Sequence, residues 1–207
     1  MAQVRFFLFF QLIVHLNYLY LMPNFLKREY NYYPFLMLYQ YIFVHFLLCI
    51  INMIKNKLLT FILFLLITFS ASLIGGLATI NFMNPWYSLL NKPIFNPPDW
   101  VFGPVWTVLY FMMTISIWLY WHTRNREMNT IYIYFIHLVF NATWSITFFA
   151  LHNMILALVV LIILIVLIIN LIIRFRRVNL VSSYLMIPYV LWCTFALVLN
   201  LNLILLN

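Results

Sequence analysis

Three aromatic side chains spaced four residues apart are the first feature of this sequence with chemical potential. Phe102, Trp106 and Tyr110 fall on one face of a helix, because residues four apart lie one above the other. An indole offers a broad π face to a flat ring system, worth about 1 kcal/mol beyond the area that it buries. The spacing predicts an aromatic wall for a flat apolar ligand, although a core or membrane-interface tryptophan fits the same pattern.

A second pattern combines an amide with aromatic rings. Asn141 and Trp144 lie about one helical turn apart and share a face with His137 and Phe148. Because an amide inside a bilayer is unfavourable unless it finds a partner, Asn141 should face other helices and not lipid. A helix–helix hydrogen bond and a place in a pocket both stay open from these residues alone.

A proline-rich segment comes before the aromatic helix. Four prolines, among them Pro97 and Pro98, remove backbone donors and drive the residues before them towards extended geometry. The segment therefore cannot be regular structure, and it also carries Trp86. We interpret this loop, residues 81–99, as a lid over a pocket.

Catalytic and metal chemistry find little support. The acids are Glu29, Asp99 and Glu127, which lie outside the long apolar runs and are too scattered to build a hydrolytic site. The histidines lack paired ligand spacing, so we expect no metal and no cofactor. Cys49 and Cys193 both lie in apolar runs, which favours buried structural thiols.

The composition identifies a membrane protein. Of 207 residues, 67% are hydrophobic and 7% are charged, whereas about a quarter of a soluble domain is charged. After residue 57, five apolar runs free of charged residues reach the roughly 20 residues that a spanning helix needs. We therefore predict an all-α fold, an integral membrane bundle of five transmembrane helices in one domain at 58–207. The runs are Leu58–Ile80, Trp100–Trp121, Ile131–Leu151, Met154–Ile173 and Leu180–Leu206.

The basic residues gather on one side of these predicted spans. The opposite side carries Lys92, which Asp99 balances. This bias predicts that the lid loop and the C-terminus face outwards in a bacterial inner membrane. It also accounts for the net charge of +8, and we expect no nucleic-acid partner. The residues on the basic side are Lys55, Lys57, Arg124, Arg126, Arg174, Arg176 and Arg177.

Residues 1–57 form a hydrophobic N-terminal extension with two readings. Phe35–Ile54 is long enough to span a membrane but is broken by polar residues, and the first reading is one extra helix there. The second reading is a true start at Met53, with residues 1–52 an over-extended reading frame or a dispensable extension, because a methionine, two lysines and then an apolar run are typical of a bacterial membrane protein's beginning.

Small residues in the first predicted span form two rows. Ala71 with Gly75, and Ser72 with Gly76, are small-xxx-small pairs. Such pairs allow close approach of another helix or of a ligand, and both alternatives stay open.

Three ordered sequence blocks carry a family resemblance, which covers residues 58–207. The blocks are Pro97-Pro98-Asp99-Trp100 with Phe102-Gly103-Pro104-Val105-Trp106, then Asn141-x-x-Trp144-Ser145, then Pro188-Tyr189-x-x-Trp192-x-x-Phe195-Ala196. They resemble the signature of the TspO/translocator protein family, the tryptophan-rich sensory proteins that include the mitochondrial peripheral benzodiazepine receptor.

The resemblance implies a membrane receptor or sensor, often a homodimer, whose cavity binds porphyrins and related tetrapyrroles or another flat hydrophobic ligand. It implies a role in tetrapyrrole or stress signalling, with slow light-dependent breakdown of the porphyrin as the one reaction expected of a protein that is otherwise no enzyme. A transporter of porphyrin, sterol or lipid is the alternative. A bacterial membrane is favoured, or the mitochondrial outer membrane in a eukaryote.

The resemblance also implies the site. Trp106 matches the family tryptophan placed against the ligand and implicated in its photochemistry, and Ala196 leaves room for the ligand one turn from Trp192. Because Lys92 is the isolated basic residue on the lid side, we hypothesise that it lies at the pocket mouth and pairs with a propionate of the porphyrin. The alternative is a solvated loop lysine. The predicted ligand-binding residues are Trp100, Phe102, Trp106, Tyr110, Asn141, Trp144, Trp192, Ala196 and Lys92, under a lid with Trp86, Pro97 and Pro98.

One departure from mammalian members concerns sterol. No basic residue follows Arg177, so the cholesterol motif proposed for their last helix cannot be written here. This favours a bacterial-type member.

Overall fold

A computed structural model describes residues 47–48, 50–51, 54 and 56–207. The chain divides into two compact units, Met1–Cys49 and Ile50–Asn207, and the second of them holds all the helices described below. The predictions about the N-terminal extension, the start at Met53 and Cys49 lie outside the described residues.

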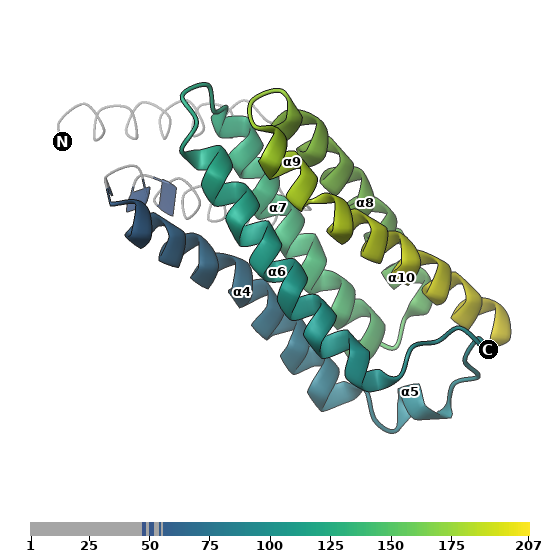
Figure 1. The fold of residues 1–207 in the computed structure, drawn as a ribbon. Coiled ribbons are helices and arrows are strands. Elements are labelled where there is room, and N and C mark those ends of the chain that lie inside the picture. The colour runs from purple at the N-terminus through teal and green to yellow at the C-terminus, as the bar shows by residue number, and fades with distance from the viewer. Residues whose placement is uncertain (1–46, 49, 52–53, 55) are drawn as a thin grey trace, which may run out of the picture. The chain divides into compact units, whose positions relative to one another are not determined.

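The described part of the second unit is helical, and five of its helical segments are long and apolar enough to cross a membrane. The predicted all-α bundle of five spans is confirmed, and the chain is a multi-pass membrane protein (Figure 1). The elements are α4 (Lys57–Phe82), α5 (Trp86–Leu89), α6 (Asp99–Trp121), α7 (Met128–Ser145), the π-helix η1 (Ile146–Ala150), α8 (Met154–Arg176), α9 (Leu180–Leu185) and α10 (Ile187–Leu206).

Asparagines in the short polar turns start several of these helices. Oδ1 of Asn56 accepts from Leu58 N at 2.9 Å and begins α4, and Oδ1 of Asn153 accepts from Leu156 N at 2.9 Å and begins α8. Asn179 does the same for α9. Each side chain satisfies backbone donors that the first helical turn leaves unpaired, which explains why the spans begin where the apolar runs are interrupted.

The last span is broken into α9 and α10 at Met186. Pro188 occupies the first turn of α10, where a missing N–H costs nothing. In a continuous helix the same proline would clash with the carbonyl four residues earlier. The proline therefore follows a break in the span.

The third span ends in a wider turn. The amide of Leu151 donates to Ile146 O at 3.0 Å, a hydrogen bond across five residues that defines η1. This widened turn buries both Phe148 and Phe149.

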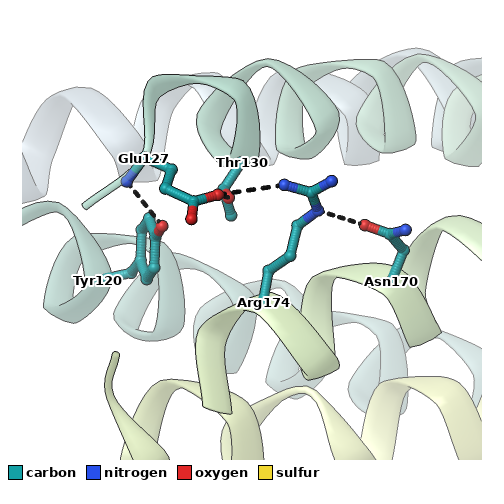
Figure 2. Close-up of polar contacts among 5 residues, drawn as sticks. All are labelled: Tyr120, Glu127, Thr130, Asn170 and Arg174. Atoms are coloured by element: carbon teal, nitrogen blue, oxygen red, sulfur yellow. Dashed lines mark hydrogen bonds and ion pairs between the residues drawn. The ribbon is translucent and has the colours of Figure 1, made fainter. Parts of the chain in front are cut away.

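Polar contacts close the end of the bundle that carries the basic residues (Figure 2). Nη1 of Arg174, at the end of α8, lies 3.2 Å from Oε2 of Glu127, just before α7. The Glu127 amide donates to Oη of Tyr120 at 2.9 Å, and Nε of Arg174 donates to Asn170 at 2.6 Å. These contacts join the α6–α7 turn to α8.

Candidate functional site

A cavity of about 440 Å³ lies between α4, α6, α7 and α10. Its size falls within the range of about 300–1,000 Å³ that is typical of small-molecule sites. Three tryptophans from three different helices line it: Trp106 from α6, Trp144 from α7 and Trp192 from α10. The convergence of indoles expected from the sequence is therefore present.

The aromatic face of α6 forms one wall. Phe102, Trp106 and Tyr110 all line the cavity, as their spacing predicts. The Trp106 ring lies 5.6 Å from that of Tyr110 and 6.2 Å from that of Tyr189 on α10. Phe102 packs edge-on against Trp192 at 6.0 Å. These contacts hold the rings in fixed orientations, so the wall is formed before any ligand arrives.

The α7 and η1 wall stacks two further rings. Trp144 lies parallel to Phe148, with ring centroids 5.6 Å apart and planes at 24°. Both line the cavity together with Asn141, whereas His137 is fully buried and is not among the lining residues. Ala196 on α10 also lines the cavity, where its small side chain leaves space.

A buried polar link crosses the end of the cavity. The Tyr110 hydroxyl donates to Oδ1 of Asn141, and Nδ2 of Asn141 donates to Oη of Tyr189 at 2.8 Å. All three side chains are at most 5% exposed. The amide thus joins α6, α7 and α10, and the helix–helix hydrogen bond and the cavity position left open by the sequence are both realised in Asn141.

The segment between α4 and α6 contains the short helix α5, so the prediction that it has no regular structure was wrong: Pro85 caps this helix from outside and Pro93 follows it. The segment covers the lid end of the cavity through Met83 and Tyr87. The Tyr87 ring packs against Phe149 at 5.9 Å, and its hydroxyl donates to Asn96 at 3.1 Å. Burial raises the pKa of Tyr87; the hydrogen bond with Asn96 opposes the rise and the Asp99 carboxylate adds to it. The phenol therefore stays a protonated donor.

The lid is also tied to α10. The Asn91 amide donates to Oδ1 of Asn207 at 2.9 Å, and Nδ2 of Asn207 donates back to Asn91 O at 3.1 Å. Figure 1 shows α5 and the end of α10 at the same end of the bundle. On the other side of the lid, Trp86 stacks on His152 at 4.5 Å.

The two rows of small residues in α4 serve different purposes. A Cβ added to Gly75 would lie 3.0 Å from Oγ of Ser145, so this glycine permits close packing of α4 on α7. A Cβ added to Gly76 would meet no atom within 4 Å, and Gly76 lines the cavity. Gly75 lines the cavity as well, so close helix approach and a place at the cavity are both found at Gly75, whereas Gly76 has the cavity position alone.

Several predicted site residues do not line the cavity. Trp100 is 74% exposed, because it lies two residues from Phe102 and points to another side of α6. Trp86, Pro97 and Pro98 belong to the lid without lining the cavity. Nζ of Lys92 lies 4.3 Å from the centroid of the Tyr87 ring. Whether any of these binds a ligand stays a prediction.

Other lining residues were not predicted from the sequence. Tyr87 and Leu203 meet at the lid end only because the lid folds back over α10, a contact that no local spacing reveals. Thr79 and Thr107 follow Gly75 and Gly103 by one turn, so spacing could have placed them. Among the described residues, no group of three or more His, Cys, Asp or Glu could hold a metal ion.

Comparison with known proteins agrees with this architecture. The model of the TspO/MBR family matches residues 61–206. A tryptophan-rich protein TspO of Archaeoglobus fulgidus is 34% identical over 64% of this chain and 87% of its own. A tryptophan-rich sensory protein of Cereibacter sphaeroides is 32% identical over 69% and 91%, and the Homo sapiens translocator protein is 31% identical over 56% and 70%. This chain therefore belongs to the TspO/MBR family.

Proposed function

We propose that this protein is a membrane receptor or sensor that binds a porphyrin or a similarly flat, mainly apolar ligand in the cavity. The observation that carries the proposal is the meeting of Trp106, Trp144 and Trp192 from three helices around one space. Flat rings gain from offset stacking and edge-on contacts with indoles. The names of the relatives, which speak of sensory and translocator proteins, support a receptor role.

The polar groups of the cavity suit orientation of a ligand more than its chemical conversion. The Tyr110 hydroxyl donates a hydrogen bond to Asn141, so these two groups already have each other as partners. Asp99 also lines the cavity, at the lid-side start of α6. Among the lining residues that the structure describes, there is no other carboxylate and no histidine. This arrangement supports binding as the main activity, with Trp106 as the ring placed for any light-dependent reaction of a bound porphyrin.

Tryptophan fluorescence quenching by protoporphyrin IX tests the proposal in the reconstituted full chain. We expect saturable quenching, and an affinity about five- to tenfold weaker in Trp106→Phe, because the smaller ring loses about 1 kcal/mol of stacking. Trp118→Phe is the matched control, on the same helix but outside the cavity lining, and should bind as the wild type does. Absence of saturable quenching, or equal losses in both variants, would refute the assignment.

Two further measurements separate the alternatives. The same titration under illumination shows whether bound porphyrin is consumed and whether Trp106→Phe stops its loss. Flux of porphyrin across proteoliposomes tests transport: a receptor gives no flux above that of protein-free vesicles, and a saturable flux that Trp106→Phe reduces would favour a transporter.

A further inference from the structure

The residues that line the cavity differ in how exposed they are, depending on the helix that carries them. Every lining residue from α7, η1 and α10 is buried or half-buried. The exposed lining residues are Ile80 on α4, together with Asp99, Gly103 and Thr107 on α6. The cavity is therefore open on the side where α4 and α6 face each other.

Large rings close the contact between α4 and α6 at the end away from the lid. Phe61 on α4 packs edge-on against Phe111 at 6.2 Å and against Trp118 at 5.7 Å. Phe69 lies 5.8 Å from the ring of Tyr110, the last α6 residue that lines the cavity. These contacts bring α4 and α6 together on the side of the cavity that is away from the lid.

Nearer the lid, the two helices carry glycines that line the cavity, Gly76 on α4 and Gly103 on α6. A Cβ built on Gly76 of α4 or on Gly103 of α6 would have no atom within 4 Å, in contrast to the 3.0 Å contact at Gly75. A packed helix interface would fill this space. The lid-side halves of α4 and α6 are therefore separated by a gap that leads into the cavity.

The gap reaches into the depth of the bilayer. Thr107 lies eight residues after the start of α6 at Asp99, which corresponds to about 12 Å along the helix. Gly76 lies six residues before the end of α4 at Phe82, which corresponds to about 9 Å. Half of a bilayer's hydrocarbon core is about 15 Å thick. Both residues therefore lie at the level of one leaflet, on the lid side.

The hydroxyls of the two threonines at the gap can face hydrocarbon without a large cost, and the Asp99 carboxylate lies apart from them at the first residue of α6. The Thr107 hydroxyl donates to Gly103 O at 2.9 Å, and the Thr79 hydroxyl donates to Gly75 O at 2.9 Å. Each hydroxyl is thus satisfied within its own helix, so it presents mainly its methyl group. A ligand passing between the helices would break no hydrogen bond there.

We propose that the ligand enters and leaves the cavity sideways, from the lid-side leaflet, through the gap between α4 and α6. The inference rests on the proposed function and narrows it: the ligand is a flat molecule that partitions into the bilayer before it binds. The lid, held by Tyr87 and by the Asn91–Asn207 contacts, stays closed during exchange.

Exchange kinetics test this route. Protoporphyrin IX is preloaded into liposomes, mixed with proteoliposomes of the full chain, and followed by tryptophan quenching. Gly76→Phe and Thr107→Phe place a ring in the gap, and Leu77→Phe and Val108→Phe are matched controls at exposed neighbours that do not line the cavity. A double variant, Asn91→Ala with Asn207→Ala, releases the lid.

We expect association and dissociation to slow together in both gap variants, by about tenfold, because a blocked path changes both rates. The two control variants and the lid variant should exchange at the wild-type rate. Wild-type rates in the gap variants, or faster exchange in the lid variant, would overturn the sideways route while leaving the proposed function intact. A wild-type chain that binds no protoporphyrin would overturn both.

Discussion

Nδ2 of Asn141 donates a hydrogen bond to Oη of Tyr189 at 2.8 Å, which links α7 to α10 at the end of the cavity. The same amide accepts from the Tyr110 hydroxyl on α6. A single side chain thus ties together the three helices that carry the three cavity tryptophans. The stability of the bundle and the shape of the cavity are coupled at this point.

Replacing Asn141 should therefore destabilise the protein as well as its site. Asn141→Leu leaves two tyrosine hydroxyls without their partner in a buried position, and we expect a loss of about 1–2 kcal/mol in the free energy of unfolding. Thermal unfolding in detergent measures it. Adding Tyr110→Phe and Tyr189→Phe should recover part of the loss, because no polar group is then left unpaired. Wild-type stability in Asn141→Leu would show that the link contributes little.

Alanine substitutions at the adjacent glycines of α4 should have opposite effects. Gly75→Ala places a Cβ 3.0 Å from Oγ of Ser145, and we expect a net loss of about 1 kcal/mol in stability, since overpacking outweighs the gain in helix propensity. Gly76→Ala meets open space and should gain up to about 1 kcal/mol. Melting temperatures of the two variants provide the comparison.

The steric explanation has its own control. Ser145→Ala removes the crowded Oγ, so it should restore stability to Gly75→Ala but add nothing to Gly76→Ala. Losses of equal size in both glycine variants would mean that crowding against Ser145 is not the cause.

The bundle was predictable because a backbone that crosses hydrocarbon must satisfy its hydrogen bonds internally. Runs of about 20 apolar residues must be helical in lipid, and all five runs are. Several of their ends lie up to three residues further out, as in α7, which begins at Met128 and not at Ile131, while the third span ends at Ala150, one residue before the predicted Leu151. The π-helical turn at 146–150 has no signal in residue type, since the hydrogen bond from Leu151 to Ile146 depends on packing.

The cavity was predictable where it follows helical spacing and not where it follows the fold of the lid. Phe102, Trp106 and Tyr110 share a face by geometry alone, and they line the cavity. Trp100 belongs to the same motif, yet its position two residues from Phe102 turns it outwards. Tyr87 could not be placed, because its burial depends on a loop that folds back onto Phe149.

A histidine at the end of α6 should give stability a dependence on pH. Burial lowers the pKa of His122 from its usual 6.5, and the charges of Lys57 and Arg126 lower it further. The folded state then binds fewer protons than the unfolded state as pH falls below about 6.5, so acidification reduces the free energy of unfolding. The effect should be small, because the ring is exposed.

Melting temperatures of the wild type and of His122→Gln, measured between pH 5 and pH 8, test the direction of this effect. In the wild type, Nε2 of His122 lies 3.0 Å from Oγ1 of Thr60, and the glutamine amide can still form this hydrogen bond. The wild type should lose more stability than the variant on acidification, and the difference between the two isolates His122 from the other histidines. A variant that loses as much as the wild type would assign the pH dependence to other groups.

Lys92 places a positive charge on the lid, close to where a negatively charged ligand would bind. Its Nζ lies 4.3 Å from the centre of the Tyr87 ring, and that ring lines the cavity, so the ammonium group lies one side chain away from the cavity. If it pairs with a carboxylate of protoporphyrin, Lys92→Gln should weaken binding up to about fivefold, since exposed ion pairs are worth about 0.2–1 kcal/mol. The loss should be largest at low salt, and Lys92→Arg should keep most of the affinity. Quenching titrations at low and high salt measure both effects. If Lys92→Gln leaves the affinity and its salt dependence unchanged, Lys92 does not pair with the ligand, and its contact with the Tyr87 ring is structural.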